Sequence, residues 1–167
     1  SIDTAVKKTS TSDEVSAQVW GRKGWAERTL LDRRYGRMGY LELKDLTLEL
    51  NQRWHPAFTL VEDKASGPDL IADLSSAVPG ILPFNPGSAS KYERSEVGSA
   101  PLYRAHQKTL PDSTLFPWVR DFETNHKAFR GRDGDADGDI DAESQLDLYW
   151  NRLARQAPFL VLPALPP

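Results

Sequence analysis

Five aspartates occupy every second position of the segment 133–141, which reads Asp-Gly-Asp-Ala-Asp-Gly-Asp-Ile-Asp. Neither a packed core nor an ordinary solvated helix needs five carboxylates so close together, because like charges repel one another. Carboxylate oxygens are, however, the ligands that hard divalent cations prefer in proteins. The spacing therefore predicts a site that holds divalent cations.

Two acidic residues far from this run fall where an α/β fold would place a site. Asp3 lies within residues 1–5, which are expected to form a strand, and a charge inside a strand needs a partner or a metal. Glu62 follows the apolar residues 57–61, an expected central strand, and α/β sheets build their sites at the carboxyl ends of such strands. Together with the aspartate run, they supply the carboxylates from three distant segments that phosphodiester hydrolysis with two metal ions requires.

A calcium loop is the main alternative for the aspartate run. With Asp133 at position 1 of an EF-hand loop, aspartates stand at positions 1, 3, 5 and 9, with Gly138 at position 6 and Ile140 at position 8. Position 12 is Ser144, where such a loop usually has a glutamate, and Glu143 is one residue out of register. A calcium-binding EF-hand-like module and a non-catalytic docking domain therefore stay open beside the metal-dependent enzyme.

The composition fits one globular domain. The chain has 167 residues, of which 39% are hydrophobic and 27% charged, and it has no cysteine, which excludes a disulfide framework and a thiolate zinc site. No apolar run approaches the roughly 20 residues of a membrane helix, and the first residues lack the layout of a signal peptide. We therefore expect a soluble protein of a reducing compartment, neither secreted nor membrane-bound.

The charge is distributed unevenly along the chain. The formal net charge is -3, but seven acidic residues and no Lys or Arg lie between Asp133 and Asp147. Without those seven, 17 acidic and 21 basic residues are left, so the remainder carries +4. A cation-loaded acidic site on a mildly basic body is compatible with binding a polyanion.

The elements that must position these carboxylates alternate between strands and helices. Beyond the two strands already named, the pattern predicts strands over 15–20, 29–33 and 81–84, and helices over 40–54, 68–76, 91–107, 115–129 and 139–155. An initial three-strand meander followed by alternating helices and strands predicts an α/β domain with a mixed sheet. The last eleven residues, 157–167, are apolar and contain four prolines, so this tail is expected to be extended.

Four segments resemble, in order and rough spacing, the nuclease domain of tailed-bacteriophage terminase large subunits. They are Ser-Ile-Asp-Thr-Ala at 1–5, Tyr-Leu-Glu-Leu-Lys at 40–44, Leu-Val-Glu-Asp-Lys-Ala-Ser-Gly at 60–67 and Asp-Gly-Asp-Ile-Asp-Ala at 137–142. The resemblance extends to about Leu153, and residues 62–67 are its most specific part. It implies an RNase H-like domain over 1–156, with helices on both faces of the sheet, followed by the Pro-rich tail 157–167.

The resemblance also implies roles for individual acids. Asp3 and Glu62 would be the first two metal ligands, Asp137 the third, and these three the catalytic residues. Asp141, which closes the Asp-x-x-apolar-Asp-Ala pattern, would be a further metal ligand or support one. Asp63 is a possible accessory residue, or a cap for the helix that follows it.

The register of the third ligand is open. Many members of the family have a histidine before the third acid and a second aspartate directly after it, where this chain has Ala136 and Gly138. Asp135 or Asp139 could therefore take the place of Asp137, and Asp139 could also be an accessory ligand.

The expected activity is endonucleolytic cleavage of double-stranded DNA during phage genome packaging in the host cytoplasm, with two Mg²⁺ or Mn²⁺ ions. The implied partners are the DNA, an ATPase motor domain of the same full-length protein, the portal and the small terminase subunit; no Walker motif occurs in this segment. Five basic residues are candidates for DNA contacts: Lys7, Lys8, Lys64, Lys91 and Arg94. The three histidines have no mutual spacing that suggests a site: His55, His106 and His126.

Overall fold

The structure of the chain is a computed structural model, and it describes residues 1–4, 13–24, 27–132, 135 and 137–156. The tail at 157–167, Lys7, Lys8 and Asp133 lie outside the described residues. No helix within the described part of the chain is long and apolar enough to cross a membrane.

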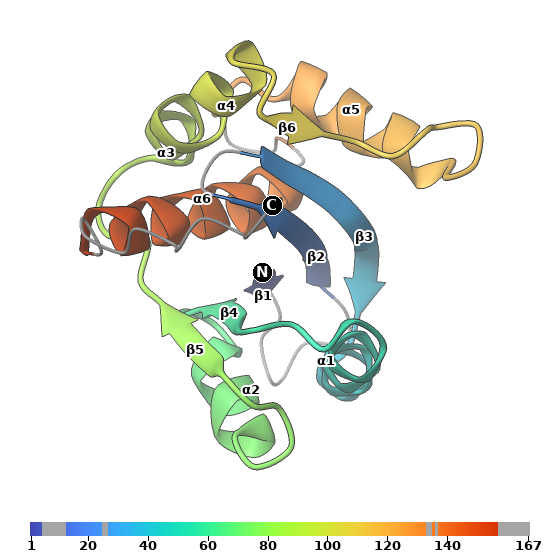
Figure 1. The fold of residues 1–167 in the computed structure, drawn as a ribbon. Coiled ribbons are helices and arrows are strands. Elements are labelled where there is room, and N and C mark those ends of the chain that lie inside the picture. The colour runs from blue at the N-terminus through green and yellow to red at the C-terminus, as the bar shows by residue number, and fades with distance from the viewer. Residues whose placement is uncertain (5–12, 25–26, 133–134, 136, 157–167) are drawn as a thin grey trace, which may run out of the picture.

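The strands of the described residues form one mixed sheet in the order β5-β4-β1-β2-β3-β6 (Figure 1). They are β1 (Ile2–Thr4), β2 (Asp13–Lys23), β3 (Glu27–Met38), β4 (Thr59–Glu62), β5 (Ile81–Phe84) and β6 (Lys108–Thr109). β1, β2 and β3 pair antiparallel, whereas the β1–β4, β4–β5 and β3–β6 pairs are parallel. The predicted α/β fold with a mixed sheet and an antiparallel N-terminal meander is confirmed.

The helices cover this sheet and connect its parallel strands. They are α1 (Tyr40–Trp54), α2 (Gly67–Leu74), α3 (Lys91–Gly98), α4 (Ala100–Arg104), α5 (Trp118–Ala128) and α6 (Gly138–Gln156). The single helix expected over 91–107 is wrong, because the chain breaks at Ser99 between α3 and α4 and then forms β6. Gly98, the last residue of α3, lies directly against α6, where an added Cβ would be 3.6 Å from the Ser144 carbonyl oxygen.

The two faces of the sheet bury different side chains. Residues that alternate along a strand point to opposite faces. Ile2, Val15, Ala17 and Val61 share one face and pack against α1 and α2.

On the other face, Leu60 and Phe84 pack against Leu146 and Trp150 of α6. Figure 1 shows α6 and α1 on opposite sides of the sheet. Asp3 and Glu62, one residue on from Ile2 and Val61, therefore face α6.

Candidate metal centre

Asp3 and Glu62 form a pair of acids on neighbouring parallel strands. Ile2 is in register with Val61, so the next residues, Asp3 in the middle of β1 and Glu62 at the carboxyl end of β4, lie side by side. The Asp3 side chain is buried and makes a hydrogen bond with the Glu62 carboxyl group. Burial, that hydrogen bond and the charges of Asp141 and Glu62 raise the pKa of Asp3 well above its usual value. Burial and the neighbouring acid therefore both disfavour the ionised form of Asp3.

The start of α6 lies over this pair. A Cβ atom added to Gly138 would be 3.4 Å from Oδ2 of Asp3 and 3.5 Å from the side chains of Ser16 and Tyr35. The first residue of α6 therefore lies directly against the sheet beside Asp3. The Asp141 amide donates a hydrogen bond of 2.9 Å to the Asp137 carbonyl, which places these two acids one turn apart.

Lys91, the first residue of α3, reaches between Asp137 and Asp141. Its Nζ is 2.6 Å from Oδ2 of Asp137 and 2.7 Å from Oδ2 of Asp141. Burial alone would lower the pKa of Lys91, but the hydrogen bonds to the two carboxylates outweigh it and raise that pKa. The other oxygen of Asp141 accepts a hydrogen bond from the buried guanidinium of Arg94. A positive charge therefore already lies among the acids at the start of α6.

The acids near this end of the sheet thus form two groups. Asp3 and Glu62 lie together on the strands, and Asp137 and Asp141 lie on either side of the Lys91 ammonium at the start of α6. Within the described residues, three or more Asp, Glu or His side chains do not converge in an arrangement that could hold a metal ion. The expected three-carboxylate set is brought to one end of the sheet, but the Lys91 ammonium lies on two of the aspartates.

Asp139 and Asp135, the alternatives for the third ligand, are engaged elsewhere. Asp139 is fully buried; Arg33 Nε is 2.9 Å from its Oδ1, and Asn125 Nδ2 is 2.9 Å from its Oδ2. Asp135 accepts hydrogen bonds from the backbone amides of Arg130 and Arg132, which lower its pKa and hold the turn before α6. Of the acids in the run that the structure describes, Asp137 and Asp141 are those next to Lys91.

The remaining candidates near the site differ in exposure. Lys64 is largely exposed and lies 3.2 Å from Oε1 of Glu62, whereas Arg94 is buried and donates to Asp141 and to the Ala89 carbonyl. Asp63 is exposed, and the expectation that it caps the next helix is wrong, because α2 begins at Gly67 after Ser66. Lys7 and Lys8 are outside the described residues.

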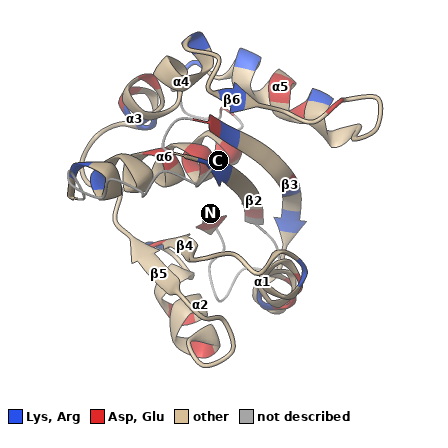
Figure 2. Ribbon diagram, viewed as in Figure 1, with Lys and Arg blue, Asp and Glu red and all other residues tan. Residues whose placement is uncertain are grey.

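Sequence reasoning missed a second set of buried charges farther along α6. Glu143 and Asp147 both bind the ammonium of Lys108, which is completely buried on β6. Asp147 also pairs with Arg28 of β3, and Nε2 of His126 is 2.7 Å from Oε2 of Glu143. Figure 2 shows these acidic segments of α6 alongside basic segments of β3 and β6.

One signal in the sequence could have revealed this set. Asp139, Glu143 and Asp147 are spaced four residues apart, which places them in one row on a helix, facing the polar strand β3. We define these three acids, with their partners Arg33, Lys108, Arg28 and His126, as the paired row.

The geometry at the start of α6 does not favour a calcium loop. Residues 138–144, which would be positions 6 to 12 of that loop, are helical from Gly138 onward. The carboxylates of Asp139 and Asp141 bind Arg33 and Arg94, respectively. An EF-hand loop needs its acids free to turn toward one central ion.

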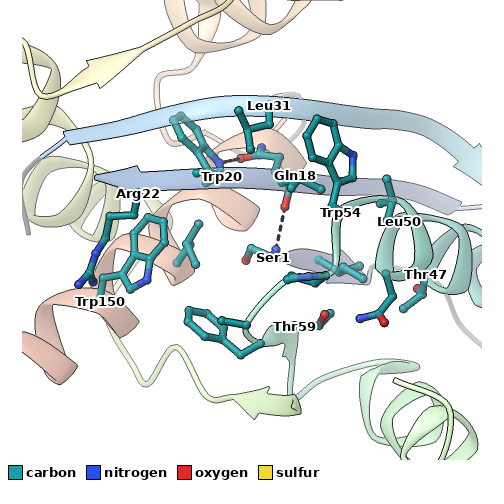
Figure 3. Close-up of a pocket in the computed structure, with 18 of the residues that line it drawn as sticks. Ser1, Gln18, Trp20, Arg22, Leu31, Thr47, Leu50, Trp54, Thr59 and Trp150 are labelled. Carbon is teal, nitrogen blue, oxygen red and sulfur yellow. Dashed lines mark hydrogen bonds between the residues drawn. The ribbon is translucent and has the colours of Figure 1, made fainter. Parts of the chain in front are cut away.

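A largely apolar cavity lies at the other end of β1. It has a volume of about 500 Å³ and is lined by the aromatic rings of Trp20, Trp54, Phe58 and Trp150. Figure 3 shows Ser1 at this cavity, with its amino group donating to the Gln18 carbonyl at 2.8 Å. Among the described residues that line the cavity, Arg22 has a charged side chain and none is an aspartate or glutamate. The cavity therefore lacks the carboxylates that a Mg²⁺ or Mn²⁺ site needs.

Comparison with known proteins does not identify a family. No family model matches the chain, and no curated protein matches it at a significant level. The function must therefore be argued from the α/β fold and from the acids around Asp3.

Proposed function

We propose that this chain is a metal-dependent endonuclease domain that cleaves double-stranded DNA by two-metal-ion hydrolysis, as the nuclease part of a phage terminase large subunit. The observation that carries the proposal is the Asp3–Glu62 pair, which lies on two neighbouring parallel strands beside the start of α6. The strand order, with β2 antiparallel to its neighbours β1 and β3, is the arrangement expected of an RNase H-like domain.

The chemistry of the donor set fits magnesium or manganese. Asp3, Glu62, Asp137 and Asp141 offer only carboxylate oxygens, which hard divalent cations prefer. Burial and the neighbouring Glu62 raise the pKa of Asp3, and a bound cation would favour the ionised form of this acid. Bound divalent ions would supply an acidified water and stabilise the leaving oxygen of the phosphodiester.

The fold would hold the four carboxylates of this site in position. Asp3 and Glu62 are held by the β1–β4 pairing, and Asp137 and Asp141 by the first turn of α6. Lys64 is exposed beside Glu62, where it would meet a DNA phosphate and position the backbone without reading its sequence. An ATPase motor domain, the portal and the small terminase subunit are the proposed assembly partners.

A plasmid-nicking assay tests the proposal. With Mn²⁺ or Mg²⁺, the wild-type chain should convert supercoiled plasmid to nicked and linear forms, and EDTA should stop it. Asp3→Asn should reduce cleavage to background, because it removes a ligand charge and leaves the side-chain volume nearly unchanged. Asp45→Asn, an exposed change on α1 at the opposite face, should cleave like the wild type.

A binding readout complements cleavage. Mn²⁺ should raise the melting temperature of the wild type and of Asp45→Asn but not that of Asp3→Asn, since a ligand stabilises the state that binds it. Tight Ca²⁺ binding without cleavage by any metal would instead support the calcium-binding module. Absence of both metal binding and cleavage would support the docking domain.

A further inference from the structure

The Lys91 ammonium has the position and partners of a bound cation. Its Nζ bridges Oδ2 of Asp137 at 2.6 Å and Oδ2 of Asp141 at 2.7 Å. We propose that Lys91 is an internal cation that competes with one of the two divalent ions, so that the wild-type site binds one ion tightly and a second weakly. This inference rests on the proposed function and concerns the loading of the same site.

The two groups of acids indicate which of the two divalent ions competes with Lys91. Asp3 and Glu62 lie side by side on β1 and β4, and the lysine beside this pair, Lys64, is an exposed side chain 3.2 Å from Oε1 of Glu62, so a first ion meets no buried ammonium there. Asp137 and Asp141 already have a positive charge between them. A second ion at these two aspartates must displace Lys91 or share the carboxylates with it.

The Lys91 side chain can move away from the acids, whereas the Arg94 side chain is held in place. The Lys91 side chain is 44% exposed, so its ammonium can move into water without opening the core. The Arg94 side chain is only 6% exposed, and its guanidinium is also bound to the Ala89 carbonyl at 3.1 Å.

The start of α3 is secured independently of Lys91. Ser90 caps the helix by accepting a hydrogen bond of 3.2 Å from the Glu93 amide, and the Glu93 carboxylate accepts one of 2.7 Å from the Ser90 amide. Removal of the Lys91 charge should therefore change the site and leave the helix in place.

Titration of the metal-free protein with Mn²⁺, followed by calorimetry and by the electron paramagnetic resonance signal of free Mn²⁺, tests the competition. The wild type should bind one Mn²⁺ tightly and a second more weakly. Lys91→Met should strengthen the second binding at least about fivefold, the lower end of typical couplings between sites. Lys91→Arg, which keeps the charge, and Lys44→Met, which removes a lysine bound to Asp73 on the other face, should bind like the wild type.

Three results of the Mn²⁺ titration and the cleavage assay would contradict the competition, the metal chemistry or the nuclease function. An unchanged or weaker second binding in Lys91→Met would overturn the competition, provided that circular dichroism shows the variant folded. Absence of Mn²⁺ binding in every variant would overturn this inference and the metal chemistry together. If the variants bind Mn²⁺ as expected but the plasmid is not cut, the proposed nuclease function fails while the competition stands.

Discussion

The Asp3–Glu62 pair and the paired row of α6 contain the same kind of residue in opposite electrostatic settings. Asp3 is buried against another acid, and its pKa is raised. In the paired row, burial alone would raise the pKa of Glu143, but Lys108 and His126 lower it. Loss of a base from the paired row would leave a buried acid without its compensating charge, whereas the adjacent acids of the Asp3–Glu62 pair are those that we propose bind a cation.

The largest expected effect comes from removing the central base of the paired row. Lys108→Met leaves Glu143 and Asp147 buried without the ammonium they share, and should lower the free energy of unfolding by about 3–5 kcal/mol. Urea denaturation measures this loss. Lys127→Met, which removes an exposed lysine 3.2 Å from Glu123, is the control and should cause little change. A stable Lys108→Met protein would show that these acids do not need their base.

The same substitution in both regions gives a direct test of the contrast. Asp139→Asn should destabilise the protein by about 3 kcal/mol, because the buried Arg33 loses its charged partner. Asp3→Asn in EDTA should change the unfolding free energy little or increase it, because it relieves the crowding with Glu62. Equal losses in the two variants would remove the distinction between the regions.

The contributions of Asp3 and Glu143 to the pH dependence of stability should have opposite signs. For Asp3, whose folded pKa is above its usual 3.8, the contribution to stability is fully present below about pH 4 and is lost as the pH rises through the folded value. For Glu143, whose folded pKa is below its usual 4.5, the contribution is present above that value and is lost as the pH falls.

Urea denaturation in EDTA at roughly pH 3 to 8 separates the two signs. The stability of Asp3→Asn relative to the wild type should increase with pH over the range in which Asp3 ionises. That of Glu143→Gln should decrease as the pH rises from the acid end. Parallel curves for wild type and Asp3→Asn would mean that Asp3 ionises normally in the folded protein.

The smallest effect is expected at the exposed edge of the Asp3–Glu62 pair. Lys64→Met removes an ammonium 3.2 Å from Glu62 that is 58% exposed, and should change the unfolding free energy by less than about 0.5 kcal/mol. If Lys64 contacts a phosphate, the slope of log affinity for DNA against log salt should fall by about 1. Fluorescence anisotropy with a labelled duplex measures that slope, and an unchanged slope would place the DNA elsewhere.

Elements with strong local signals could be predicted from the sequence. The helix Tyr40–Trp54 has the expected bounds because its apolar residues recur at helical spacing and Pro56 follows it. The strand Ile81–Phe84 also matches. By contrast, β6 has only two residues, and its pairing with Arg28 and Thr29 exists only in the folded chain.

The site was predictable in its positions but not in its contacts. Asp3 could be placed inside a strand and Glu62 at the end of one from the apolar residues around them. Lys91 could not be placed between Asp137 and Asp141, since 46 residues separate it from Asp137 and only the packing of α3 on α6 joins them. The long strand β3 was underestimated for a related reason, because its buried arginines resemble surface residues until their acidic partners are known.

The residue at which α6 begins determines the directions in which Asp137, Asp139 and Asp141 point. On a helix, residues two apart point in nearly opposite directions, at about 200°, whereas residues four apart nearly align. Acids that stand at every second position therefore form two sets on the helix. Asp137 and Asp141 point toward Lys91, and Asp139 and Glu143 point toward Arg33 and Lys108. One inserted residue at the helix start would turn both sets by about 100° and deprive each of its partners, so the phase of the repeat, more than its acidity, specifies this end of the molecule.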